Sequence, residues 1–85
     1  MENLESLDSY SVTLYTHDFK EPETYNIYKI KFLNISSKLE CSASGKSGEE
    51  SCTFTLHPWK VDSAEEFYMI KNEMTAISAE LSVNN

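Results

Sequence analysis

The chain has 85 residues, 40% of them hydrophobic and 25% charged, which is the composition of one small globular domain and not of a disordered segment. Its 14 acidic residues oppose seven lysines, no arginine occurs, and the formal net charge is −7. Proteins that bind nucleic acid need cations to displace the counterions of phosphates, so this balance argues against direct binding to DNA or RNA. The apolar runs are too short to predict a signal peptide or a membrane span.

The first predicted strand lies near the N-terminus. It follows a polar segment, residues 1–9, that we interpret as either a single helical turn or a frayed arm. Residues 10–15 then alternate between two faces, and the face with the larger apolar side chains consists of Tyr10, Val12 and Leu14. The segment 16–24 contains Pro22, which cannot donate to a strand ladder, so we expect a loop there.

The second predicted strand covers residues 25–33. In an extended chain Tyr28, Ile30 and Phe32 share one face, and the lysines between them share the other. Because the alternation fails beyond this segment, we expect the strand to end or to bulge near Asn34.

The third and fourth predicted strands flank the clearest turn of the sequence. Residues 39–43 and 52–56 alternate, and the segment 44–51 between them holds both glycines of the chain. Cys41 and Cys52 fall on the core-facing sides of these strands, close enough to bridge if the two residues pair directly. They could form a redox pair, half of a metal site, or two small buried thiols. We favour the thiols, because two cysteines without a signal peptide make a poor disulfide framework.

The strongest helix prediction lies in the last part of the chain. Ser63 followed by Glu66 fits a capping box, and Asp62 followed by Glu65 fits equally well. The apolar residues that follow recur at spacings of three and four and form one narrow stripe: Phe67, Ile70, Met74, Ile77 and Leu81. Such a stripe is typical of a helix that packs against a sheet.

Together these elements predict an α+β fold of ββββα order. We expect two layers, a four-stranded antiparallel sheet with one C-terminal amphipathic helix packed on one face and solvent on the other. No repeat or linker interrupts the chain, so residues 1–85 should form a single domain. The predicted core consists of Val12, Leu14, Tyr28, Ile30, Phe32, Leu39, Cys41, Cys52, Phe54, Leu56, Phe67, Ile70, Met74, Ile77 and Leu81.

The sequence offers little catalytic or metal-binding chemistry. Neither His17 nor His57 accompanies a glycine-framed nucleophile, and the segment 45–47 lacks the glycine spacing and the following helix of a phosphate loop. Cys52 and His57 point to opposite faces of their strand, so zinc ligands would not converge there. We therefore expect a protein that is not an enzyme, with no catalytic residue, no cofactor and no metal.

Acidic residues are expected to gather at one end of the predicted sheet, where the loop 16–24 and the turn 44–51 emerge. This acidic pole comprises Asp18, Glu21, Glu23, Glu49 and Glu50. A second acidic group is expected at the opposite end and includes Asp8 and Asp62. The simplest interpretation is a solvated surface that keeps the chain soluble.

One flank of the predicted C-terminal helix carries glutamates about 10 Å apart. This helix flank consists of Glu66, Glu73 and Glu80, with Met69 as a small apolar anchor beside them. Apolar groups rimmed by acids suit a protein interface better than bare solvent. An alternative contact surface of opposite character is the outer face of the predicted sheet, with Ser11, Thr13, Tyr15, Lys29, Lys31, Thr53 and Thr55.

Two segments resemble a known family. Residues 65–68 (EEFY), followed by residues 74–81 (MTAISAEL), resemble the C-terminal helix of small phage inhibitors of the CRISPR nuclease Cas9. Residues 10–14 (YSVTL) resemble the first strand of those inhibitors. The family is acidic, of similar length, combines a short sheet with helices, and occupies the groove that reads target DNA. The resemblance therefore implies an anti-CRISPR protein that imitates DNA.

The charge and the resemblance predict a small phage or mobile-element inhibitor that acts in the cytoplasm of the host cell. Its partner would be a host protein with a basic, nucleic-acid-binding surface, such as a CRISPR effector, and not nucleic acid or a membrane. One alternative is an immunity protein or antitoxin that neutralises a basic toxin. Another is a virion accessory or assembly protein, whose contacts should be more apolar and less sensitive to salt. The oligomeric state stays open.

Overall fold

The computed structural model describes the backbone of residues 3–84 and the side chains of residues 3–82. In this part of the chain the longer elements are β1 (Tyr10–Tyr15), α1 (Pro22–Leu33), β2 (Glu40–Lys46), β3 (Glu49–Leu56) and α2 (Ala64–Asn84). Short 3₁₀ turns lie among them: η1 (Leu4–Ser6), η2 (Thr16–Asp18) and η3 (Pro58–Lys60).

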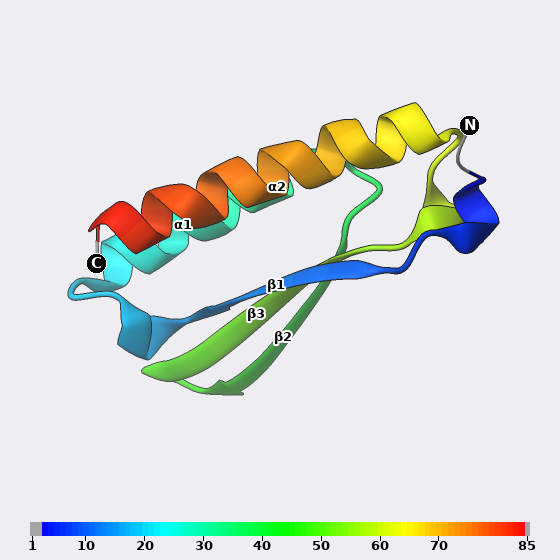
Figure 1. The fold of residues 1–85 in the computed structure, drawn as a ribbon. Helices are drawn as coiled ribbons and strands as arrows, with labels where there is room; N and C mark the ends of the chain where they lie inside the picture. The colour runs from blue at the N-terminus through cyan, green and yellow to red at the C-terminus, as the bar shows by residue number, and fades with distance from the viewer. Residues whose placement is uncertain (1–2, 85) are drawn as a thin grey trace.

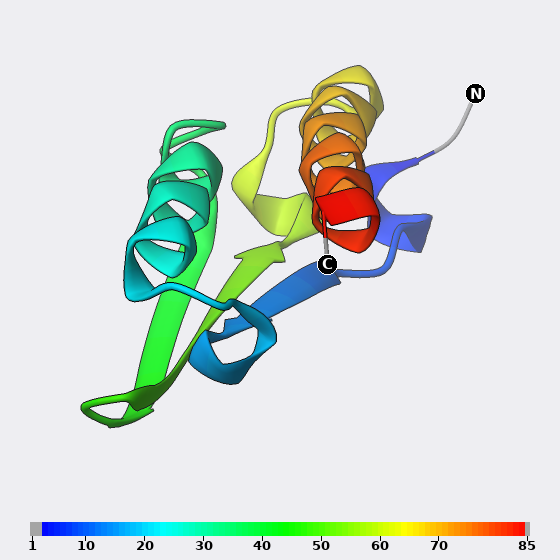
Figure 2. The same cartoon turned by 90° about the vertical axis from the view of Figure 1, so that its left-hand side faces the viewer.

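The strands form one antiparallel sheet in the order β1-β3-β2. β1 pairs with β3 from Tyr10 opposite Leu56 to Tyr15 opposite Ser51. Both helices lie on one side of this sheet, α2 beside α1 (Figure 1, Figure 2). The α+β class is thus confirmed, as are the strands predicted near residues 10–15, 39–43 and 52–56.

The strand predicted over residues 25–33 is wrong, because this segment is helix α1. Pro22 occupies the first helical turn, where a missing N–H breaks no hydrogen bond. The buried residues of α1 recur at helical spacing: Tyr25, Tyr28 and Phe32. Ile30, which alternation places beside Phe32, points away from the core and is 56% exposed. The apolar residues of this segment are numerous enough to satisfy a period of two and a period of 3.6 at once.

The predicted four-stranded sheet packed on one helix is therefore corrected to three strands and two helices among the described residues. Because α1 intervenes after β1, the chain leaves the sheet and re-enters at its far edge. β3 then returns between β1 and β2, so the sheet is not a simple meander. β1 and β2 are both edge strands as a result.

The core lies between the two helices and the sheet. Phe32 of α1 stacks on Phe54 of β3 with ring centroids 5.0 Å apart, and both side chains are fully buried. The apolar stripe predicted on the C-terminal helix packs into this core, with Met74 fully buried at its centre. Cys41 is a further error in the predicted core, because β2 is an exposed edge strand. Val61 is buried without having been predicted.

The outer face of the sheet carries paired hydroxyl groups. Across β1 and β3, Ser11 lies 3.0 Å from Thr55 and Thr13 lies 2.9 Å from Thr53, oxygen to oxygen. This face meets solvent, as the alternation in the sequence predicts.

The described part of the N-terminal segment contains a single 3₁₀ turn, η1. In η1 the side chain of Asn3 accepts a hydrogen bond from the N–H of Glu5 at 3.2 Å, and Leu4 packs against the edge of the core. Of the two interpretations of residues 1–9, the structure shows the helical turn, and residues 1–2 lie outside the described residues. Over the described helices, none is both long enough and apolar enough to cross a membrane.

Candidate partner-binding surface

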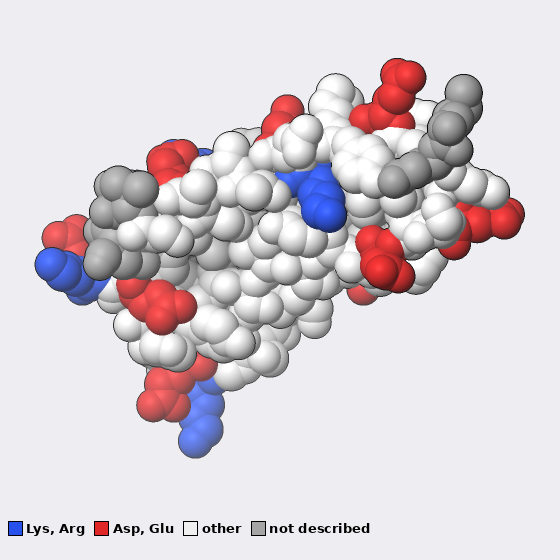
Figure 3. All heavy atoms as spheres, viewed as in Figure 1, with Lys and Arg blue, Asp and Glu red and all other residues white. Residues whose placement is uncertain are grey.

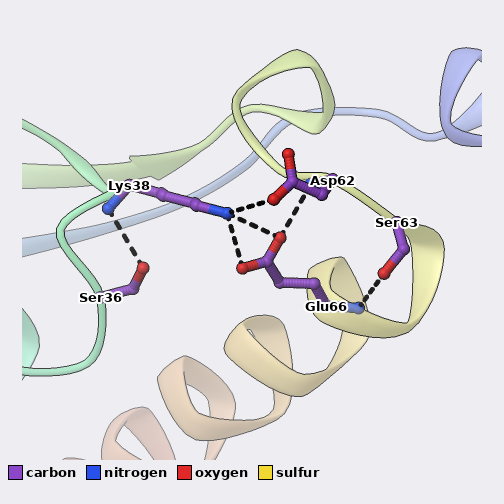
Figure 4. Close-up of polar contacts among 5 residues, drawn as sticks. All are labelled: Ser36, Lys38, Asp62, Ser63 and Glu66. Carbon is purple, nitrogen blue, oxygen red and sulfur yellow. Dashed lines mark hydrogen bonds and ion pairs between the residues drawn. The ribbon is translucent and has the colours of Figure 1, made fainter.

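Glu66 of the helix flank belongs to the N-terminal cap of α2. Ser63 precedes the helix, and its Oγ accepts a hydrogen bond from the N–H of Glu66 at 3.1 Å. The carboxylate of Glu66 in turn accepts from the N–H of Asp62 at 2.8 Å (Figure 4). Of the two predicted capping pairs, the structure therefore uses Ser63 with Glu66.

The same carboxylate holds the loop between α1 and β2. Lys38 of this loop donates to both oxygens of Glu66, at 2.9 and 2.7 Å, and to Asp62 at 3.2 Å (Figure 4). The N–H of Asp62 and the ammonium of Lys38 stabilise the ionised carboxylate, so they hold the pKa of Glu66 below its ordinary value. The negative charge of Glu66 is thus paired with a lysine of the same chain.

Glu80 makes the corresponding link between the two helices. Its Oε1 accepts from the Nζ of Lys31 at 3.0 Å and from the hydroxyl of Tyr28 at 3.1 Å, both on α1. The ion pair with Lys31 and then the hydrogen bond from Tyr28 lower the pKa of the Glu80 carboxyl. Two of the three glutamates of the helix flank therefore bind neighbouring segments of the same chain.

These pairs predict a specific loss of stability in acid. Because the pKa of each carboxyl is lower in the folded chain, the stabilisation is complete above the unfolded pKa and is lost as the pH falls through the folded pKa. We expect Glu66→Gln combined with Glu80→Gln to lower the Tm at neutral pH and to flatten its dependence on pH between about 5 and 3. Thermal unfolding followed by circular dichroism across this range measures both effects.

Glu73→Gln is the matched control for that experiment. Glu73 lies on the same flank of α2, is exposed, and makes no ion pair with any described residue. Its Tm and pH profile should follow those of the parent chain. If Glu73→Gln lowered the Tm as much as the double variant does, the ion pairs with Lys38 and Lys31 would not be the cause of the lower Tm.

Met69 and Glu73 are the members of the helix flank that remain open to a partner. Met69 is 59% exposed on the outer side of α2. Glu73 lines a shallow hollow between the helices, together with Lys31, Asn34, Ile35, Ala76 and Ile77. Only this middle part of the predicted flank therefore presents a free carboxylate next to an apolar side chain.

The acidic pole is assembled by contacts between η2 and the β2–β3 turn. Thr16 Oγ1 donates to the carbonyl of Gly48 at 3.2 Å and accepts from the N–H of Glu50 at 3.1 Å. The turn needs glycine at Gly45, where φ is +99° and an added Cβ would collide with the carbonyl oxygen of Glu49. The structure thus brings Asp18 to the same end of the sheet as the two turn glutamates.

The two remaining acids of the pole lie at the start of α1, which follows η2 directly (Figure 1). All five side chains are exposed: Asp18, Glu21, Glu23, Glu49 and Glu50. Asp18 lies 3.5 Å from the ring of His17, and the other four make no ion pair with a described residue. Lys46 stands opposite Glu49 in the ladder, so the pole also includes a cation.

Acidic groups also lie at the other end of the molecule, which measures 43 × 26 × 18 Å overall. Glu5 lies within η1, Asp8 follows this turn, and Glu65 lies in the first turn of α2. In the view of Figure 3, acidic side chains lie at both ends of the face and along its edges, and a basic side chain lies near its centre. The acidic pole is therefore one of several acidic regions on an elongated body.

A hollow beside η1 and η3 was not foreseen in the sequence. Its walls are mostly apolar and include Leu4, Leu7, Pro58 and Val61, with Trp59 beside them at 71% exposed. The one available signal was Pro58, which ends the alternating strand and marks a turn.

His57 joins three strand ends near this hollow. Its Nδ1 lies 2.7 Å from the Oγ of Ser9, its Nε2 lies 3.5 Å from a carboxylate oxygen of Glu40, and its ring stacks on Trp59 at 4.3 Å. A hydroxyl, an imidazole and a carboxylate in contact are the components of an activated nucleophile. However, the hollow includes neither Ser9 nor His57, so it offers no substrate position beside the hydroxyl. We interpret these contacts as structural.

No candidate metal site occurs in the described part of the chain, where no group of three or more histidine, cysteine or acidic side chains could hold an ion.

Comparisons with models of protein families, with curated proteins and with solved structures found no match.

Proposed function

We propose that this protein is a small acidic inhibitor, encoded by a phage or mobile element, that covers the basic surface of a nucleic-acid-handling protein in the host cytoplasm. The observation that carries the proposal is the acidic pole, where three separate segments place exposed carboxylates at one end of the sheet. A surface built to hold phosphates attracts such a cluster and speeds its association. The resemblance to Cas9 inhibitors makes a Cas9-type effector the first partner to test.

The shape of the molecule supports the same proposal. Its long dimension of 43 Å equals roughly a dozen base pairs of B-DNA at about 3.4 Å per pair. A groove that normally holds a duplex of that length is therefore long enough to receive the whole molecule, with the acidic pole against its basic residues. The helix flank supports it less, because Lys38 and Lys31 already neutralise Glu66 and Glu80.

The test is a competition for DNA. We expect the protein to reduce binding of a fluorescent target duplex to Cas9 loaded with guide RNA, and the effect to weaken as salt rises from about 0.05 to about 0.2 M. Replacing the four unpaired acids of the pole by glutamine (Glu21, Glu23, Glu49 and Glu50) should slow association roughly ten-fold and flatten the salt dependence. Surface plasmon resonance at two salt concentrations measures both.

The control removes four acids elsewhere that make no ion pair with a described residue, by Glu5→Gln, Asp8→Asn, Glu65→Gln and Glu73→Gln. An equal loss in this variant would show that net charge acts, and not the acidic pole. A Cas9 complex that binds DNA unchanged excludes that effector. A partner captured from host lysate provides the test of polyanion mimicry itself. Mimicry would be contradicted if the association rate of this partner did not change with salt or with the four glutamine substitutions in the acidic pole (the pole variant).

The virion accessory or assembly alternative is favoured by a different observation. The outer side of α1 exposes three aliphatic residues, each at least half exposed: Ile27, Ile30 and Leu33. A contact through this stripe would be apolar and insensitive to salt. Binding that is lost in Ile30→Asp and retained in the pole variant would favour this alternative over inhibition by mimicry.

A further inference from the structure

The two cysteines meet across the β2–β3 pair although they are not register partners. Cys41 stands opposite Phe54 and Cys52 opposite Ala43, so the cysteines are diagonal neighbours. Their sulfur atoms are 3.1 Å apart, and both residues are free thiols. A disulfide bond is about 2.05 Å long, so closing the bond requires the sulfurs to approach by only about 1 Å.

The two thiols differ in access. Cys41 is exposed on the edge strand, and Cys52 is fully buried in the core. Every residue of β2 is exposed, and its side chains are mostly small. This strand is held by its ladder to β3 and not by packing, so it can shift by the small distance that bond formation requires.

We propose that Cys41 and Cys52 form a redox modification site, at which a hydroperoxide converts the two thiols into an intrachain disulfide between β2 and β3. This inference does not rest on the proposed inhibitory function. It requires only the contact between the sulfurs and the access of peroxide to one of them.

The oxidation proceeds in two balanced steps. The thiolate of Cys41 attacks one oxygen of hydrogen peroxide, forming an S–O bond and breaking the O–O bond, and the leaving hydroxide takes up the proton lost by Cys41 and departs as water. The sulfur of Cys52 then attacks the sulfenic sulfur of Cys41, forming the S–S bond and breaking the S–O bond. The second hydroxide leaves with the proton of Cys52 as water. The two thiols lose two electrons and the peroxide gains them.

The surroundings assign these roles to the two residues. Burial, and then the hydrogen bond with Cys41, raise the pKa of Cys52 to about 12, although Lys29 of α1 opposes the rise. Cys52 therefore stays a protonated thiol at neutral pH. The exposed Cys41 is the one that meets peroxide first, and Cys52 is the resolving thiol.

The experiment treats the full chain with hydrogen peroxide at neutral pH. The chain is then unfolded, alkylated with iodoacetamide and weighed by mass spectrometry. We expect a monomer with no alkylated cysteine, and two alkylated cysteines once dithiothreitol has reduced it. Because a crosslink restrains the unfolded chain, the oxidised protein should unfold at a Tm about 10 °C higher than the reduced one.

Two variants separate the roles. Cys41→Ser should keep Cys52 fully alkylatable after peroxide and should show no rise in Tm. In Cys52→Ala, peroxide should leave Cys41 as a sulfenic acid that dimedone traps. Because this substitution alters the core, the Tm of the treated variant is compared with the Tm of the same variant before treatment. Both thiols still alkylatable in the treated parent chain would overturn the proposal. So would a disulfide-linked dimer through Cys41 that leaves Cys52 free.

Discussion

Replacing Met74 by aspartate is expected to abolish cooperative unfolding of the domain. Met74 is fully buried at the centre of the apolar stripe of α2, facing the sheet. An unpaired buried charge costs several kcal/mol, and a small domain has a total stability of only about 5–15 kcal/mol. Circular dichroism during urea and thermal denaturation should show a broad transition or none.

Met69→Asp is the matched control, because it makes the same change on the same helix. Met69 is exposed on the outer side of α2, so its replacement should change the stability by no more than about 0.5 kcal/mol. If Met74→Asp unfolds as cooperatively as Met69→Asp, the stripe of α2 does not face the core.

Phe32→Ala is expected to destabilise the chain by about 3–5 kcal/mol. The Phe32 ring is fully buried against Phe54, and its loss leaves a cavity between α1 and the sheet. Ile30→Ala, two residues earlier, should change the stability by about 0.5 kcal/mol or less, because its side chain lies in solvent and alanine favours the helix. Urea denaturation of the two variants with a common m-value measures both differences.

This pair of variants distinguishes the helix from the strand. A strand would place Ile30 and Phe32 on the same face and would make both substitutions costly. A helix separates them by about 200° around its axis, so only one of them is buried. If Phe32→Ala and Ile30→Ala lowered the free energy of unfolding by similar amounts, this segment would not be the helix α1.

The error at α1 has a physical origin in the segment itself. Apolar residues at 25, 27, 28, 30, 32 and 33 satisfy a strand pattern and a helix pattern together. Pro22 near the start and the length of 12 residues both favour a helix, and they were the signals that the alternation obscured. Which of the apolar residues is buried depends on the sheet beneath them, and the segment alone does not contain that information.

The charges of the helix flank illustrate the same limit. Residues 24–39 carry three lysines and no acid, and residues 61–85 carry a net charge of −4. The sequence shows these two groups but not which lysine meets which carboxylate. The packing of α1 and its following loop against α2 decides that Lys31 pairs with Glu80 and that Lys38 pairs with Glu66.

The sequence by itself determined the features that depend on neighbouring residues. Composition and net charge, the three strands that alternate over residues 10–15, 39–43 and 52–56, the glycine turn, a helix cap at Asp62 or Ser63 and the stripe of α2 are local patterns, and local interactions suffice to read them. Only the tertiary structure decided the strand order, the helical state of residues 22–33, which acids stay free, and the contact between Cys41 and Cys52. Each of these depends on contacts between residues far apart in the chain, whose geometry is set by how the whole core packs.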